Sequence, residues 1–180
     1  DEQQPYNLRI AGSATQTIGS SGQVYDVAHM QIFQGDLLRG IGGTANPQAG
    51  RRVLAQPMHD LSAFAVNPTN ASGPTGSVAL GADGSMAAFV PARRALSWQL
   101  TSPTGTPVVR ERYWLTFQPG EIRVCASCHG VNGLDQAGQP APTNVPQALI
   151  DLLVNWQSAT GPTLGTGARK GVLVKGGRHL

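Results

Sequence analysis

Short stretches in which apolar and polar residues alternate recur through the middle of the chain, and glycine, proline or asparagine separates them. Alternation with a period of two is typical of β-strands that bury one face. The turn sequences between the stretches recur at intervals typical of a sandwich or small barrel. The expected strands cover residues 23–33, 77–80, 86–90, 95–100 and 108–117. The pattern therefore predicts a mainly β fold, either a β-sandwich or a small barrel-like meander.

The pattern changes after Gly120. A short segment with the cysteines comes first, and apolar residues then recur at helical spacing over residues 146–157, which predicts one C-terminal helix. Asn144 is the expected N-cap of this helix. Within the β-rich part, the glycine-rich residues 35–50 are expected to form turns. We divide the chain into a flexible N-terminal segment (1–22), a β-rich domain (23–120), a cysteine-bearing segment with the helix (121–158) and a glycine-rich tail (159–180).

Charged residues make up 13% of the 180 residues, about half of the roughly 25% that is typical of soluble proteins. The 13 Lys and Arg against 10 Asp and Glu give a formal net charge of only +3, and these residues are scattered. A nucleic-acid-binding surface needs concentrated positive charge, so nucleic acid is not an expected partner. No apolar run approaches the roughly 18 residues that cross a bilayer, so no transmembrane segment is expected.

The two cysteines stand three positions apart in the sequence Cys125-Ala126-Ser127-Cys128-His129. Cys-x-x-Cys-His is the attachment sequence for c-type haem. Cysteines at this spacing project from one side of a short helical turn and reach the two vinyl groups of one porphyrin. The adjacent His129 then presents its imidazole to the iron from the proximal side. The motif predicts one covalent haem c on Cys125 and Cys128, with His129 as an iron ligand.

Other uses of a Cys-x-x-Cys pair fit the sequence less well. A thioredoxin-like redox pair belongs in a βαβ context after an aromatic residue, and both are missing here. A structural zinc site needs four ligands, and the sequence holds no second Cys or His pair at the required spacing. A reduced cysteine pair beside an ordinary surface histidine is the remaining alternative.

A second axial ligand of the iron separates electron transfer from ligand chemistry. No methionine follows the motif, so this ligand is expected from the N-terminal half of the chain. The candidates, in order of preference, are His59, Met58, His29 and Met30. A methionine on a strand is more often a core residue, and a lone histidine is usually a surface or core residue. An open, five-coordinate iron is the other alternative.

The hairpin that leads into the motif supplies further candidates for the haem pocket. Trp98, Tyr113 and Trp114 are expected to wall the pocket, and ordinary core packing is an equally good interpretation for Trp98. Arg123 is expected to pair with a haem propionate, because arginine favours planar carboxylates.

Residues 76–130 resemble the haem-bearing domain that the hydrazine synthase alpha-subunit middle domain shares with larger bacterial proteins. The resemblance rests on Ala82-Asp83-Gly84-Ser85, Val90-Pro91-Ala92 and Gln118-Pro119-Gly120-Glu121, the last of which leads into the Cys-x-x-Cys-His sequence. It implies a β-rich domain with one covalent haem, exported to the periplasm or beyond the cell. In the hydrazine enzyme a tyrosine four residues after the motif histidine is an unusual ligand. Gly133 occupies that position here, which favours His129 on the iron.

A single attachment motif with no second catalytic constellation favours a monohaem c-type cytochrome that acts in electron transfer. Its partner would be a redox protein or neighbouring copies of the same chain. One alternative is a haem enzyme or gas-binding sensor with an open distal site. Another is a structural haem subunit of a larger assembly or filament. The resemblance does not imply hydrazine synthesis, which requires further haems and subunits.

Overall fold

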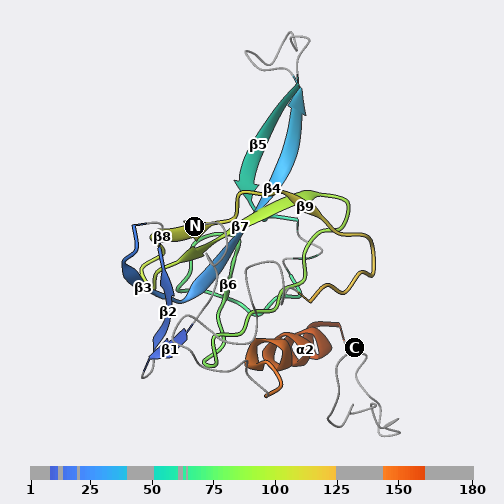
Figure 1. Ribbon diagram of the computed structural model, residues 1–180. Helices are drawn as coiled ribbons and strands as arrows, with labels where there is room; N and C mark the ends of the chain where they lie inside the picture. Colours follow the sequence, from blue (N-terminus) through green and yellow to red (C-terminus); the bar gives the residue numbers. More distant parts are fainter. Residues whose placement is uncertain are drawn as a thin grey trace, which may run out of the picture.

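The computed structural model describes residues 9–11, 14–19, 21–39, 51–60, 63, 65–124 and 144–160. These residues form a three-stranded sheet, a six-stranded sheet and the helix α2 (Gln147–Thr160), which confirms the mainly β class with a C-terminal helix (Figure 1). The small sheet is an antiparallel meander of β1 (Arg9–Ala11), β2 (Ala14–Ile18) and β3 (Val24–Val27). Its strands β1 and β2 lie in the stretch that was expected to be flexible.

The large sheet is built around one long strand, β4, which pairs with three others. Its members are β4 (His29–Arg39), β5 (Arg51–Pro57), β6 (Ser77–Ala79), β7 (Ala95–Thr101), β8 (Pro107–Arg110) and β9 (Leu115–Thr116). The main path runs β5-β4-β7-β8, with β6 paired to β4 and β9 paired to β7. In the described part of the chain β5 and β8 do not pair, so this sheet is open. The outer halves of β4 and β5 form a two-stranded ribbon that projects from the body (Figure 1).

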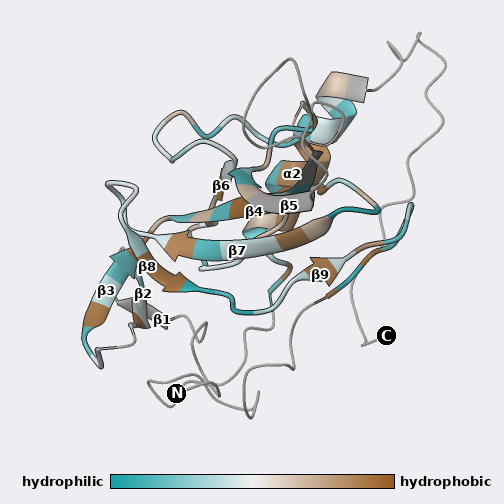
Figure 2. Ribbon diagram, turned by 90° about the horizontal axis from the view of Figure 1, so that it is seen from above, coloured by the Kyte–Doolittle hydropathy of each residue, from teal (hydrophilic) through white to brown (hydrophobic). Residues whose placement is uncertain are grey.

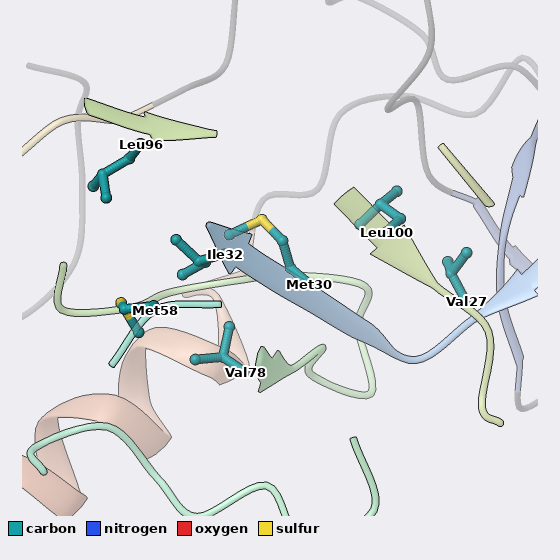
Figure 3. Close-up of a cluster of buried hydrophobic side chains, with 7 residues drawn as sticks. All are labelled: Val27, Met30, Ile32, Met58, Val78, Leu96 and Leu100. Atoms are coloured by element: carbon teal, nitrogen blue, oxygen red, sulfur yellow. The ribbon is translucent and has the colours of Figure 1, made fainter. Parts of the chain in front are cut away.

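The apolar core lies on one face of the large sheet (Figure 3). Because side chains alternate between the two faces of a strand, Met30 and Ile32 on β4 share a face with their partners on β7. Met30 pairs with Leu100, and Ile32 with Trp98. Figure 2 shows the corresponding alternation of hydrophobic and hydrophilic residues along β7. The buried members of the cluster are Val27, Met30, Ile32, Met58, Val78, Leu96 and Leu100.

The opposite face of β4 and β7 is buried as well, but it is polar. Gln99 donates from Nε2 to Oε1 of Gln31 at 2.7 Å, and Arg110 donates from Nη2 to Oε1 of Gln99 at 2.7 Å. Gln31 in turn donates to the carbonyl of Thr75 at 2.9 Å. Hydrogen bonding of this kind offsets the desolvation of buried amides. His29 begins this row of polar residues.

The strand predictions were wrong at two places, where side chains rather than a neighbouring strand bond to the backbone. Residues 86–90 form no strand, because the amide and carbonyl of Phe89 bond to the side chain of Asn67 at 2.8 and 2.9 Å. The expected strand over residues 108–117 is split into β8 and β9. Between β8 and β9, Glu111 Oε1 accepts hydrogen bonds from the amides of Arg112 and Tyr113 at 2.7 and 3.0 Å. These two amides therefore do not bond to a neighbouring strand.

Two further strand boundaries differ from the expectation. The strand predicted over residues 23–33 is two strands, because the backbone of Ala28 bonds to Thr101 and Leu80 instead of continuing one ladder. The turn predicted to begin at residue 35 is also wrong, since β4 continues to Arg39. There Gly35 pairs with Ala55 and Ala95 on its two neighbours, and cross-strand pairing overrides the weak strand propensity of glycine.

Candidate functional site

The Cys-x-x-Cys-His sequence, which is the predicted haem-attachment motif, lies outside the described residues. Cys125, Cys128 and His129 belong to residues 125–143, which separate Val124 from Asn144. The candidate site is therefore built from the two described ends that hold this segment and from the residues expected to reach the haem.

The chain leading into the motif is fixed to the large sheet. Thr116 on β9 pairs with Ala95 on β7, and the carbonyl of Phe117 accepts the amide of Arg93 at 2.8 Å. Phe117 itself packs against the apolar core. The guanidinium carbon of Arg123 lies 4.6 Å from the centre of the Phe117 ring. This cation–π contact holds the last residues before Cys125 against the body of the domain.

Arg123 also pairs with the carboxylate of Glu121, to which its Nε donates at 2.8 Å. The amide of Gln118 donates to the other carboxylate oxygen at 2.7 Å and closes a short turn. The Gln118 hydrogen bond, followed by the Arg123 contact, lowers the pKa of the Glu121 carboxyl. Arg123 was expected to face a haem propionate. In the structure Glu121 already occupies its Nε, so a propionate would have to share this guanidinium.

The chain leaving the motif is held by a distant turn. Asp83 Oδ2 accepts the amide of Gln147 at 2.9 Å and the side-chain Nδ2 of Asn144 at 2.8 Å. Ser85 Oγ accepts the amide of Ala148 at 3.0 Å. The first amides of a helix lack partners within the helix, so Asp83 and Ser85 together cap the N-terminus of α2. The turn is formed by the amide of Gly84, which donates to the carbonyl of Gly81 at 2.9 Å.

The capping arrangement lowers the pKa of Asp83. Partial burial alone would raise this pKa, but hydrogen bonds from Ser85, Gln147 and Asn144 outweigh it and lower the value from 3.8 to about 2. Asp83 is therefore an anion at the positive end of the α2 dipole. Asn144 was expected to cap the helix, and this was wrong, because its side chain donates to Asp83 rather than accepting helix amides.

The rest of α2 is docked along residues 63–90. Ala148 and Leu152 are buried, and Asn155 donates from Nδ2 to the carbonyl of Val66 at 2.8 Å. The rings of Trp156 and Phe89 lie 6.4 Å apart. Contacts at both ends of the helix therefore fix it relative to the sheet, beneath which it lies in Figure 1.

The hydrogen bonds of His59, the first candidate for the second axial ligand, indicate which of its ring nitrogens carries the proton. Its side chain is 51% exposed. Nδ1 lies 2.9 Å from the carbonyl of Pro57, which can only accept, so Nδ1 carries the proton and the lone pair is on Nε2. Gln34 Oε1 accepts hydrogen bonds from the backbone amides of His59 and Asp60. Gln34 Nε2 lies 3.3 Å from His59 Nε2. When protonated, the same Nε2 faces Asp36 Oδ2 at 3.3 Å.

His29 has the opposite arrangement. It is 3% exposed, and Asn70 Nδ2 lies 3.2 Å from its Nδ1. Ser77 Oγ donates to the carbonyl of Pro74, so it must accept from Asn70, and the amide group of Asn70 therefore also faces His29. Nδ1 is then the acceptor and Nε2 carries the proton. Among the described residues His29 Nε2 has no hydrogen-bond partner, and the same holds for Oγ1 of Thr101 across the ladder.

The two methionine candidates lie in the apolar core. Met58 is 1% exposed and Met30 is 5% exposed. Either thioether would have to leave the core to bind an iron.

The aromatic candidates do not form one wall in the structure. Trp98 packs against the core, whereas Tyr113 is 67% exposed. Trp114 is 45% exposed and lies over β4, where a Cβ on Gly35 would meet its ring at 3.5 Å. Among the described residues no group of three or more His, Cys, Asp or Glu side chains is placed to hold a metal ion.

Residues 12–130 match the family model for the hydrazine synthase alpha subunit middle domain. The match covers about two thirds of the chain and ends just after the Cys-x-x-Cys-His sequence. The chain belongs to this family. The expected resemblance of residues 76–130 to the hydrazine synthase alpha-subunit middle domain is thereby confirmed, whereas the haem remains a prediction. Helix α2 lies beyond the residues that this family model matches. No curated protein and no solved structure matched the chain.

Within the part of the chain that the structure describes, no helix has both the length and the apolar character that crossing a bilayer requires.

Proposed function

We propose that this chain is a monohaem c-type cytochrome that transfers electrons. One haem c is attached through thioether bonds to Cys125 and Cys128, and His129 is its proximal ligand. The observation that carries the proposal is the Cys-x-x-Cys-His sequence, located at the end of the stretch that matches the hydrazine synthase alpha middle-domain family. When bound, the haem supplies a reversible one-electron couple.

The described residues around the motif support this role. Glu121 and Arg123 hold the chain immediately before Cys125, and Asp83 holds the chain at Asn144. Both ends of the proposed attachment segment are thus bonded to the β-rich part of the chain, which would limit how far the haem can move relative to the sheet. Two thiols for the thioether bonds and an imidazole for the iron are the groups that c-type haem requires.

His59 is the second axial ligand in this proposal. Its exposed Nε2 has the lone pair that iron binding needs, and the Pro57 carbonyl fixes the tautomer by accepting from Nδ1. To bind the iron, Nε2 gives up its contacts with Gln34 and Asp36. With His129 and His59 both bound to it, the iron would have no open position for a substrate, as expected of an electron carrier.

The proposed location is the periplasm or the cell exterior, as expected for a haem c protein of this family. Its partner is a redox protein or a neighbouring copy of the chain. Low overall charge supports close contact with a partner more than long-range steering.

The test is expression of the whole chain in a host that matures c-type cytochromes. We expect haem that stays on the polypeptide after denaturation, and a reduced-minus-oxidised spectrum with c-type bands. The Cys125→Ser and Cys128→Ser variants should each lose one thioether bond, whereas a Ser127→Ala control should keep both. Wild-type protein without covalent haem would overturn the proposal.

Carbon monoxide separates electron transfer from the open-site alternative. Slow or partial binding to the reduced protein supports a six-coordinate iron. A rapid and complete spectral shift would show an open distal position and would overturn simple electron transfer in favour of a haem enzyme or gas sensor.

A further inference from the structure

Helix α2 exposes an apolar surface that the fold of the described residues leaves uncovered. Ala148 and Leu152 face the body of the domain and are buried. The outer face of α2, which we define as Leu149, Ile150, Leu153 and Val154, is 38, 42, 48 and 59% exposed. Asp151 is the only charged residue of the helix. A surface helix normally carries polar side chains there, so an apolar outer face indicates a further occupant.

The position of this face along the chain indicates which occupant it has. Residues 125–143 end at Asn144, directly before α2, and they carry the proposed attachment cysteines. Apolar residues flank this segment on both sides: Ile122 and Val124 are 92 and 83% exposed, and Val145 is 62% exposed. Exposed apolar side chains therefore lie at both ends of the segment that would hold the haem.

We propose that the outer face of α2 covers the haem held by Cys125 and Cys128. This inference rests on the proposed function and adds to it the surface that excludes water from the cofactor. A porphyrin is a broad, flat and mainly apolar group, and burying it against aliphatic side chains stabilises both by the hydrophobic effect. Reduced solvent exposure also changes the reduction potential of the iron.

A second copy of the chain fits this surface less well. A stable interface between two proteins buries about 800 Å² on each partner and involves about 20–30 residues a side. The outer face of α2 is four side chains on one helix. Such a narrow strip suits one planar group that is tethered to the neighbouring segment.

The capping of α2 gives this surface a fixed place. Asp83 and Ser85 hold the first turn, and Asn155 bonds to the carbonyl of Val66 near the other end. Leu149 and Leu153 are consequently presented by a helix whose two ends are both attached to the domain. A cofactor covered by them has a defined environment rather than a mobile one.

The test compares two carboxylate substitutions on the same helix in haem-loaded whole protein. Leu153→Asp places a charge in the outer face, whereas Ser158→Asp places the same charge on the polar side as a control. We expect both variants to keep covalent haem. Leu153→Asp should lower the reduction potential and change the circular dichroism of the main haem absorption band, and Ser158→Asp should do neither. Leu153→Asn introduces a polar side chain without a charge. It should change the circular dichroism of the haem band in the same direction as Leu153→Asp.

The outcomes are distinguishable. Leu153 variants with a wild-type potential and haem dichroism would overturn the inference while leaving the proposed function intact. If the Leu153 variants instead converted a dimer into a monomer, a second copy of the chain would cover the outer face of α2. That result would also overturn the inference. Wild-type protein without covalent haem would overturn the proposed function itself, before any α2 variant is compared.

Discussion

Asp83 Oδ2 lies 2.9 Å from the amide of Gln147, which is the first residue of α2. A turn in the middle of the domain thus supplies the N-terminal cap of a helix that follows the proposed haem-attachment segment in the chain. Ser85 Oγ completes the cap by accepting the amide of Ala148 at 3.0 Å. Ala82-Asp83-Gly84-Ser85 is one of the sequences that carry the family resemblance, and its role in the structure is to fix the chain that leaves the motif.

Removing the carboxylate should loosen α2. We expect Asp83→Ala to lower the free energy of unfolding by about 1–2 kcal/mol, the upper part of the range for lost helix caps. Urea unfolding followed by helix circular dichroism measures the change. Asp151→Ala is the matched control, because that carboxylate accepts from the Gln147 side chain of its own helix at 2.8 Å and not from a helix amide. An equal loss in both variants would mean that Asp83 contributes no cap.

The same cap should make stability depend on pH in the acid range. The pKa of Asp83 is lowered from 3.8 to about 2. Asp83 is therefore protonated below pH 3.8 in the unfolded chain, but only near pH 2 in the folded chain. The stabilisation is complete above the unfolded pKa and is lost as the pH falls through the folded pKa. The lowered pKa of Glu121 acts in the same direction.

Unfolding of wild type and Asp83→Ala, compared from neutral pH down to about pH 2, isolates the contribution of Asp83. We expect the difference in stability between the two proteins to shrink as the pH falls below 3.8. A difference that stays constant across this range would show that the carboxylate is not the stabilising group.

A side chain at Gly76 should destabilise the fold. Its φ is +75°, and a Cβ there would lie 2.6 Å from the amide nitrogen of Met58. That amide cannot retreat, because it donates to the carbonyl of Ile32 at 2.8 Å. Gly22 has a similar φ of +78°, but a Cβ there would meet no atom within 4 Å. Gly22→Ala therefore measures the cost of the backbone conformation alone, about 1–2 kcal/mol.

We expect Gly76→Ala to lower the free energy of unfolding by a further 1–3 kcal/mol, roughly the cost of overpacking a tight site. Thermal or urea unfolding of the two variants makes the comparison. Equal losses would show that the Met58 backbone moves aside, and that the packing around the core is less rigid than the structure indicates.

The sequence predicted the fold best where hydrophobic alternation and backbone pairing agree. Strand β7 was expected over residues 95–100, and its Leu96 and Leu100 lie in the core. The alternation failed at residues 86–90, where Asn67 takes the place of a partner strand. One polar side chain elsewhere in the chain decided between strand and irregular structure, and no local pattern contains that information.

The prediction of haem attachment rests on adjacent residues alone, in the Cys-x-x-Cys-His sequence, whereas the surroundings of that sequence depend on distant residues. The cap of α2 comes from Asp83, 64 positions away from Gln147, while the local candidate Asn144 only donates to it. The apolar residues of the helix were identified by their spacing. Only the structure divides them into Leu152, which is buried, and Leu153, which is 48% exposed.

The two histidines allow the last prediction, because their hydrogen bonds fix opposite tautomers. The carbonyl of Pro57 accepts from His59 Nδ1 and leaves the lone pair on Nε2, whereas Asn70 donates to His29 Nδ1 and leaves a proton on Nε2. This difference favours His59 over His29 as the proposed second ligand of the iron. We expect His59→Ala to keep covalent haem but to bind carbon monoxide rapidly, and His59→Met to raise the reduction potential, as methionine ligation does in cytochromes c.

His29→Gln is the control for both effects, because it removes the other imidazole from the N-terminal half of the chain. Its haem spectrum and potential should equal those of the wild type, although its stability should fall, since the substitution disturbs the buried contacts with Asn70 and Ser77. Rapid carbon monoxide binding by His29→Gln but not by His59→Ala would contradict this choice. Asn70 would then have to present its oxygen, rather than its amino group, to His29. The tautomer assignment, and with it the choice of His59, would then be wrong.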